Sequence, residues 1–233
     1  MHTSKNSIHI IIYGVVGAIQ ISGELWEIHI LADAAKSALM PTLALYLWRS
    51  EIHNEARYPL FMGLFFSWIG DLLLINGSDQ FYFLLGMLSF FLAHVAYILT
   101  FSRAGANWTE SRPLKIFMIF IALGGAYFNF CQLSPGLGDM TIYVLAYTII
   151  IIAMMIFAAL RMGGTNNYSL VLAFGGALLF VLSDSIIGYS RFVSPIPFGH
   201  SYVMITYVLA QGSIVSGLVR HGHVDNQKIR ELE

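Results

Sequence analysis

The sequence predicts an all-α integral membrane protein, a bundle of eight transmembrane helices with the N- and C-termini in the cytoplasm. Three observations predict this fold class. Of the 233 residues, 57% are hydrophobic and only 11% are charged, whereas a soluble domain carries about 25% charged residues. Eight apolar stretches are long enough to cross a bilayer. Basic residues gather in the connections on one side of these stretches, as they do in membrane proteins.

Each apolar stretch approaches the roughly 20 residues that a helix needs to cross about 30 Å of hydrocarbon. The connections are short and leave little chain outside the membrane, so only helices can satisfy the backbone. The first run, from Ile8, has no small-x-small cleavage site, and we interpret it as a membrane helix rather than a signal peptide. No polar stretch is long enough for a second domain, so we expect one domain over residues 1–233. The predicted spans are about 7–25, 29–48, 58–76, 81–101, 113–131, 139–161, 168–188 and 199–220.

Lysine and arginine residues orient the predicted bundle. Ten of the twelve lie on the side that holds both termini, while the opposite side holds only Arg191 and the second span contains Lys36. An excess of basic residues marks the cytoplasmic side, so both termini are expected in the cytoplasm. The ten residues are Lys5, Arg49, Arg57, Arg103, Arg112, Lys115, Arg161, Arg220, Lys228 and Arg230.

Charge and cysteine content exclude some functions. The net charge of −1 argues against nucleic acid as a partner. The single cysteine, Cys131, cannot form a disulfide within the chain. Because it lies within an apolar span, we expect it to be a small buried hydrophobic residue.

Two aspartates lie inside predicted spans, Asp71 in FFSWIGDLLLI and Asp184 in LLFVLSDSIIG. A charged side chain in hydrocarbon costs about 2.5–3.5 kcal/mol on insertion scales, so it is rarely kept for packing alone. Both predicted helices run outward, and the aspartates lie roughly 6 and 9 Å past their centres. Lys36 falls in the same outer layer. The sequence therefore predicts a working pair of carboxylates near Lys36; the alternative is one buried charge network of the three.

Other polar residues in the spans also allow a structural interpretation. Lys36 can pair with Asp33, which lies three residues earlier on the same helical face. His94 can form an ordinary hydrogen bond between helices, and so can Gln211. These interpretations stay open beside the functional ones.

Five segments, in this order along the chain, resemble the YhhN family of lysoplasmalogenases, which is found in bacteria and, as related transmembrane proteins, in animals. One departure is Ser37, which follows Lys36 where the family often has proline. The segments are Lys36 with the apolar helix after it, SWIGDLLL at 67–74, FLLGMLSFFLAHVAYI at 83–98, LSDSIIGYSRF at 182–192 and YVLAQGSIVSG at 207–217.

The resemblance implies cleavage of the vinyl ether bond of lysoplasmalogens to a fatty aldehyde and glycerophosphocholine or glycerophosphoethanolamine. It also implies eight transmembrane helices and two essential aspartates, which map here to Asp71 and Asp184. We expect a multi-pass protein of the bacterial inner membrane whose partners are membrane lipids and a lysophospholipid substrate with a vinyl ether chain. The sequence leaves open whether the protein forms a homodimer.

Two carboxyl groups suit this chemistry because acid opens a vinyl ether. A proton adds to the carbon β to the oxygen, water adds to the resulting oxocarbenium ion, and the hemiacetal collapses. One carboxyl must be protonated, which burial favours, and the other must stabilise the cation and accept a proton from water, as in glycosidases. The sequence does not assign these two catalytic roles to Asp71 and Asp184, and a coupled pair can share a proton.

The reaction needs only water, so we expect neither a cofactor nor a metal. Ser183 precedes Asp184, while Gly70 precedes Asp71. We therefore expect Asp184 to be the better hydrogen-bonded carboxylate. The candidates for substrate binding are Lys36, His94, Tyr97, Ser183, Tyr207 and Gln211.

Two other classes of function fit parts of this pattern. A zinc-dependent membrane lipid hydrolase needs about three histidines around the metal, but only His94 lies well inside a span, while His29 and His200 lie near helix ends. A proton-coupled small transporter uses intramembrane carboxylates as a relay, and its helices are often interrupted by glycine, which residues such as Gly70 and Gly175 would supply.

Overall fold

The computed structural model describes residues 3–50 and 55–232, with side chains described for 8–50 and 55–221. Residues 1–2, 51–54 and 233 of the predicted domain lie outside the described residues. Within the described ranges every secondary-structure element is a helix. The elements are α1 (Thr3–Leu25), α2 (His29–Arg49), α3 (Arg57–Leu74), α4 (Gln80–Arg103), α5 (Arg112–Leu137), the 3-10 helix η1 (Gly138–Met140), α6 (Thr141–Leu160), α7 (Asn167–Phe192) and α8 (Gly199–Leu232).

Most helix ends lie within a few residues of the predicted spans, but α5 and α8 are longer than predicted. The predicted spans of about 113–131 and 139–161 leave a connection between them, and this prediction is wrong, because α5 continues through Pro135 to Leu137. Proline cannot donate a backbone hydrogen bond to the carbonyl four residues earlier. Here the hydroxyl of Ser134 donates to that carbonyl, on Cys131, at 3.0 Å, which offsets part of the cost. Helix α8 continues to Leu232 instead of ending near residue 220.

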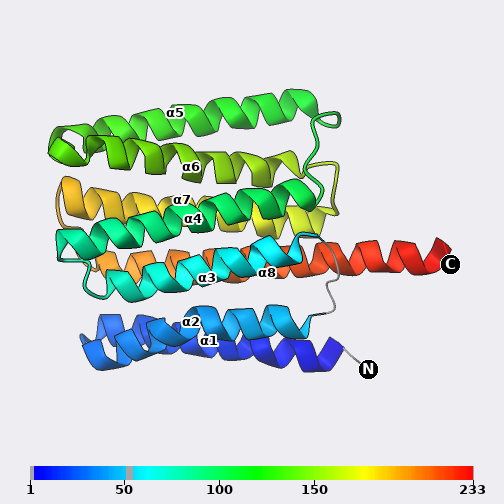
Figure 1. The fold of residues 1–233 in the computed structure, drawn as a ribbon, viewed down its shortest axis with the longest axis horizontal. Helices are drawn as coiled ribbons and strands as arrows, with labels where there is room; N and C mark the ends of the chain where they lie inside the picture. The colour runs from blue at the N-terminus through cyan, green and yellow to red at the C-terminus, as the bar shows by residue number, and fades with distance from the viewer. Residues whose placement is uncertain (1–2, 51–54, 233) are drawn as a thin grey trace.

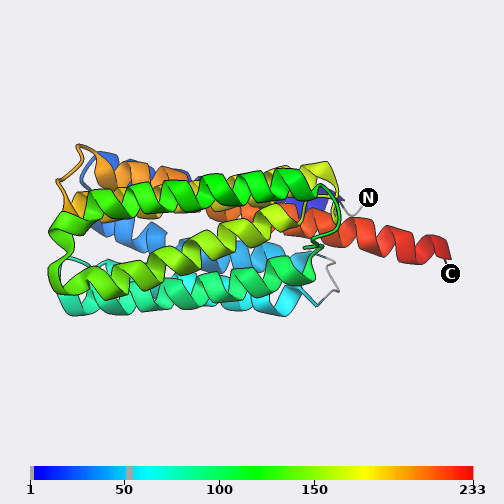
Figure 2. The ribbon, with the colours of Figure 1, turned by 90° about the horizontal axis from the view of Figure 1, so that it is seen from above.

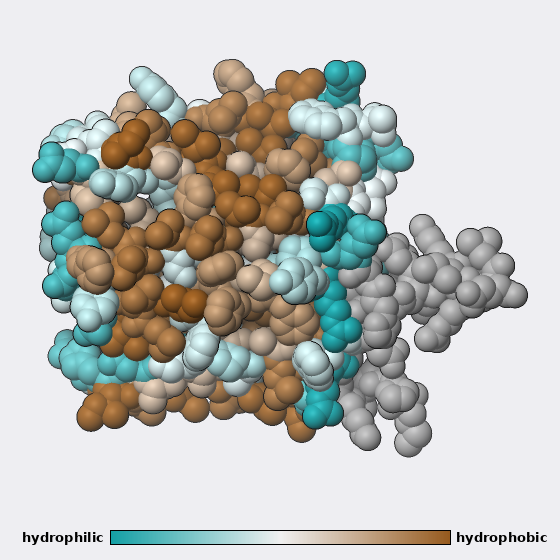
Figure 3. Space-filling model, in the orientation of Figure 1, coloured by the Kyte–Doolittle hydropathy of each residue, from teal (hydrophilic) through white to brown (hydrophobic). Residues whose placement is uncertain are grey.

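Six segments of the described chain are long and apolar enough to cross a membrane, and they indicate a multi-pass membrane protein. One of the six, Arg112–Leu160, contains α5, η1 and α6 together. Helix α3 is not among the six, because its 18 residues include Arg57 and Asp71. Figure 3 shows the same pattern on the surface, with hydrophobic residues over the middle of the molecule and hydrophilic residues toward its two ends.

The helices lie side by side along the long axis of the molecule (Figures 1 and 2). Helices α5 and α6 form one edge of the bundle, α1 and α2 form the opposite edge, and α3, α4, α7 and α8 lie between them (Figure 1). The start of α1 and the end of α8 lie at the same end of the bundle. This placement agrees with the prediction that both termini share one side of the membrane.

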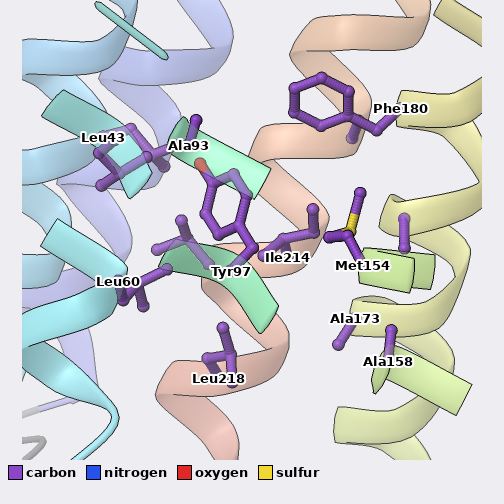
Figure 4. Packing of buried hydrophobic residues seen from close by; sticks show 14 of the residues in the cluster. Leu43, Leu60, Ala93, Tyr97, Met154, Ala158, Ala173, Phe180, Ile214 and Leu218 are labelled. Atoms are coloured by element: carbon purple, nitrogen blue, oxygen red, sulfur yellow. The ribbon is translucent and has the colours of Figure 1, made fainter. Parts of the chain in front are cut away.

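The core lies where the central helices meet. Tyr97 and Phe180 are fully buried there, and Figure 4 shows them among smaller apolar residues of neighbouring helices. Two glycines allow the close contacts that build this core. A Cβ atom on Gly70 would lie 2.6 Å from the Phe90 ring, and one on Gly176 would lie 2.7 Å from the carbonyl of Ala210. Helices α3 and α4, and α7 and α8, can therefore approach each other closely.

Two basic residues fasten the end of the bundle where the chain starts and ends. The Arg161 side chain is fully buried and donates to the Ala104 carbonyl at 2.7 Å and to the Ser169 hydroxyl at 2.8 Å. The Lys115 ammonium donates to the carbonyl and to the side-chain oxygen of Asn107, both at 2.9 Å. Residues that the charge pattern assigns to the cytoplasmic side therefore also hold α4, α5, α6 and α7 together.

Candidate active site

A cavity of about 520 Å³ lies among α4, α5, α6 and α7, with Leu74 of α3 also in its wall. Most of the wall is aliphatic and aromatic. A cavity of this size, lined by apolar groups with a few polar ones, is typical of a site that binds a small, largely apolar molecule. The polar side chains in the wall are Asn129, Tyr147, Thr148, Asp184 and Ser185.

Asp184 is the acidic residue in the cavity wall. Its carboxylate accepts a hydrogen bond from the Tyr147 hydroxyl at 2.5 Å. His94 lies beside this pair, with Nε2 3.1 Å from the Tyr147 oxygen and 3.6 Å from the carboxylate. The Asp184 side chain is 16% exposed and that of His94 is fully buried. The Tyr147 hydroxyl donates a hydrogen bond to Asp184, so its oxygen can only accept one from His94. The Nε2–H group of His94 is therefore the donor to Tyr147.

The second nitrogen of His94, Nδ1, is buried without a hydrogen-bond partner among the described residues. The His94 ring packs against Phe180, with ring centroids 4.8 Å apart. The hydrogen bonds therefore run from His94 through Tyr147 to Asp184. We call these three residues the Asp184 cluster.

Asp71 occupies a different environment. It is only 2% exposed and is not part of the cavity wall. Its carboxylate accepts a hydrogen bond from the Tyr207 hydroxyl of α8 at 2.8 Å. Lys36 and Asp184 both lie close enough to interact with it electrostatically. We call Asp71, Tyr207 and Lys36 the Asp71 cluster.

Two phenylalanines lie between the clusters. The Phe180 ring packs on His94 of the Asp184 cluster at 4.8 Å and on Tyr207 of the Asp71 cluster at 5.5 Å. Phe90 packs edge-on against Phe180 at 6.2 Å and against Tyr207 at 5.9 Å, and it also lines the cavity. The predicted proximity of the two aspartates is therefore indirect, since aromatic rings link them and only one of them faces the cavity.

Tyr97 and Gln211 form a third polar group with Ser67. The Tyr97 hydroxyl donates to Gln211 at 2.6 Å, and the Gln211 amide donates to Ser67 at 3.0 Å. All three side chains are buried, and none lines the cavity. This group joins α3, α4 and α8, which is the structural role that the sequence allowed for Gln211.

One expectation and one alternative about neighbouring residues do not agree with the structure. The hydroxyl of Ser183 donates to the Val203 carbonyl at 3.1 Å, and the hydrogen bond to Asp184 comes from Tyr147 instead. A side chain in a helix points away from its neighbour in sequence, so Ser183 faces α8 while Asp184 faces the cavity. Lys36 forms no ion pair within 4 Å among the described side chains, so the alternative in which it pairs with Asp33 is not observed.

Sequence reasoning missed Tyr147 and Asn129. Each is a polar side chain in the middle of an apolar helix, and each lines the cavity. A polar residue within an apolar helix could have indicated both, because such residues in a span usually face the protein interior.

The described side chains contain no group of three or more His, Cys, Asp or Glu residues that could hold a metal ion. His94 is the histidine nearest to the cavity carboxylate, and the group it contacts is Tyr147. The Asp184 cluster thus offers one carboxyl group, one phenol hydroxyl and one imidazole beside an apolar cavity.

Comparison with known proteins finds a matching family model and several similar proteins. The YhhN family model matches residues 31–218. The chain is 34% identical to lysoplasmalogenase TMEM86A of Bos taurus and 32% identical to that of Homo sapiens, in both cases over 65% of this chain and 61% of the relative. It is 31% identical to lysoplasmalogenase TMEM86B of Homo sapiens over 80% of this chain and 76% of that protein. The match thus spans less than two thirds of the TMEM86A relatives. No solved structure matches the chain.

Proposed function

Because the chain belongs to the YhhN family, we propose that it is a lysoplasmalogenase, which cleaves the vinyl ether bond of lysoplasmalogens to a fatty aldehyde and glycerophosphocholine or glycerophosphoethanolamine. The observation that carries this proposal is the apolar cavity with the carboxyl group of Asp184 in its wall. An alkenyl chain is apolar, and acid opens its vinyl ether. One site therefore offers both a place for the alkenyl chain and a carboxyl group that can protonate its vinyl ether. The names of the relatives supply the substrate class.

The proposed topology follows from the helices and the basic residues. Eight helices of one domain, residues 1–233, cross the bacterial inner membrane, with both termini in the cytoplasm. The shared position of the start of α1 and the end of α8 supports an even number of crossings (Figure 1). Helix α3 crosses although it is not among the six segments that qualify by length and composition, because its polar residue Asp71 faces the protein interior.

Asp184 is proposed to act on the reacting atoms. In its protonated form it gives its proton to the alkenyl carbon β to the ether oxygen, and the carbon bonded to that oxygen becomes part of an oxocarbenium ion. Water adds to this carbon and returns one proton to the Asp184 carboxylate. In the resulting hemiacetal the carbon–oxygen bond breaks, the glycerol oxygen takes a proton, and the hydroxyl becomes the aldehyde. One water is consumed and the carboxyl group is restored, as general acid–base catalysis requires.

The remaining site residues are proposed to support this carboxyl group. Tyr147 orients Asp184, and His94 orients Tyr147, through the hydrogen bonds described above. Asp71 is the second required carboxyl group. Because it is outside the cavity wall, it acts on Asp184 through the electrostatic interaction between the two carboxyl groups. Lys36 acts in turn on Asp71.

The test is a pair of turnover assays on the purified protein in detergent. One substrate is a lysoplasmalogen and the other is the lysophospholipid with the same chain in an acyl linkage. We expect fatty aldehyde from the first and no fatty acid from the second. Fatty acid from the second would instead identify an ester hydrolase. No product from either substrate, with folded protein, would overturn the proposed activity and favour the transporter alternative.

A further inference from the structure

Arg191 lies at one end of the cavity. It is exposed near the end of α7, and its guanidinium lies 3.9 Å from the centre of the Phe83 ring. Phe83 and Phe192, the residue after Arg191, both line the cavity. The guanidinium is also held by a hydrogen bond of 2.7 Å to the Gly77 carbonyl. The arginine is thus fixed at the rim of the proposed alkenyl site.

The Arg191 guanidinium has further N–H donors with which it can bind an anion. A guanidinium has five N–H donors in a planar fork that matches phosphate oxygens. Among the described residues, the Gly77 carbonyl is the one hydrogen-bond acceptor recorded for Arg191, and no carboxylate lies within 4 Å of it. Arg191 is also the basic residue that the charge pattern sets apart from the ten on the opposite side of the membrane.

The spacing along α7 fits the proposed substrate. Arg191 follows Asp184 by seven residues, which is two helical turns or about 10 Å along the axis, so both share one face of the helix. In a lysophospholipid the ether oxygen and the phosphorus are separated by five bonds, or about 6 Å. The long arginine side chain can span the difference, so one molecule can contact both residues.

The opposite direction along α7 offers room for the alkenyl chain. Phe174 also lines the cavity, and it precedes Asp184 by ten residues, about 15 Å along the helix. The cavity wall near it is apolar. The carboxyl group of Asp184 therefore lies between an apolar compartment and a cationic rim, which is the order of groups in a lysophospholipid.

We propose that Arg191 is the substrate's phosphate-binding residue, which holds the phosphodiester at the rim of the cavity while the vinyl ether lies at Asp184. This inference rests on the proposed function for the identity of the substrate. In this role Arg191 sets the affinity and the position of the substrate and takes no part in the chemical steps.

Binding of uncleavable lipids tests the site without relying on activity. The probes are hexadecyl glycerophosphocholine, a saturated ether that acid catalysis leaves intact, and hexadecylglycerol, which lacks the phosphate. We expect Arg191→Gln to weaken binding of the phosphate probe about tenfold, as expected for losing a hydrogen-bonded charge, and to leave binding of hexadecylglycerol unchanged. Arg191→Lys should retain part of the affinity, because lysine keeps the charge but not the fork.

Arg220→Gln is the matched control. Arg220 is also an exposed arginine stacked on an aromatic ring, 4.2 Å from the centre of Tyr168. It lies on α8 and is not part of the cavity wall. This variant should bind both probes like the unaltered protein. A diacyl phosphatidylcholine added as competitor should displace the phosphate probe only weakly.

Several results would overturn the proposal. They are an unchanged affinity of Arg191→Gln for the phosphate probe, an equal loss for both probes, which would mark a structural role, and efficient displacement by the diacyl lipid, which would mark a site for bilayer lipid. Turnover adds an independent measurement, since Arg191→Gln should raise KM for lysoplasmalogen about tenfold with kcat within twofold. Binding that depends on Arg191 in a protein without vinyl ether turnover would uphold the phosphate site and reject the proposed hydrolysis.

Discussion

Asp71 and Asp184 have similar sequence surroundings but different environments in the fold. Each follows a small residue in the second half of a helix that contains several aromatic residues, and each accepts one hydrogen bond from a tyrosine of another helix. Yet Asp184 lies in the cavity wall, whereas Asp71 is 2% exposed and lies outside it. Whether the aspartate reaches the cavity is therefore decided by the neighbouring helices and not by the residue's own segment. The two carboxylates should differ accordingly in function.

The largest expected effect is that of Asp184→Asn. The amide is nearly isosteric but cannot deliver a proton, and general acid–base catalysis is worth about 10²–10⁴-fold. We expect kcat for lysoplasmalogen to fall about 10³-fold, measured as release of fatty aldehyde. Binding of hexadecyl glycerophosphocholine should stay within a few-fold of the unaltered protein. Turnover above a tenth of the original rate would remove Asp184 from the chemistry.

Asp71→Asn should have a smaller effect, because Asp71 acts through Asp184. We expect kcat to fall about 10²-fold, within the range of acid–base effects, and the pH dependence of kcat to change. The control is Asp139→Asn in η1, an exposed aspartate that belongs to neither cluster and is not part of the cavity wall, which should leave rate and pH profile as they are. A rate as low as that of Asp184→Asn, with the pH profile unchanged, would contradict an indirect role.

The two tyrosines sharpen the comparison further. Tyr147→Phe removes the donor to the cavity carboxylate, and we expect kcat to fall about tenfold, since a hydrogen bond to a charged group is worth about 1.5–3 kcal/mol. Tyr207→Phe leaves a buried carboxylate without its donor, so its main effect should be on stability, about 1 kcal/mol as for other hydrogen bonds within membranes. Thermal unfolding and kcat should be measured on both. A loss of stability in Tyr147→Phe together with a loss of kcat in Tyr207→Phe would contradict these roles and assign the chemistry to the Asp71 cluster.

The smallest expected effect concerns the cavity itself. Ala126 of α5 lines it, and Ala126→Leu adds volume inside, so KM should rise a few-fold for long alkenyl chains and stay unchanged for short ones. Ala146→Leu, an exposed position of α6 outside the wall, is the matched control. The two substitutions add the same side chain. If both change KM equally, the alkenyl chain does not occupy this cavity.

Much of the fold could be predicted because its signals are local. Apolar length placed most helix ends to within a few residues, since crossing a membrane requires it, and both aspartates could be singled out because a carboxylate is rare in a span. The continuation of α5 through Pro135 could not be predicted, because the hydroxyl of Ser134 supplies a bond that proline omits. The role of Tyr147 depends on a partner in another helix, which no local pattern contains.

Cys131 is another residue whose environment could not be predicted from the sequence. We expected a buried residue, but the cysteine is exposed on α5. Interior and lipid are both apolar, so the two environments select similar residues, and a helix that is apolar all round does not reveal which face is covered. Only the position of α5 at the edge of the bundle decides it (Figure 1).

That same cysteine gives the protein a built-in attachment point for a probe. It is the single thiol of the chain, so a nitroxide or an environment-sensitive fluorophore will label one position without mutagenesis. Asn129 and Leu133, two residues to either side of it, line the cavity, so the label will sit on the outer face of the helix that forms the cavity wall. Its spectrum should report movements of α5 as a lipid enters from the bilayer, in the unaltered protein and in real time.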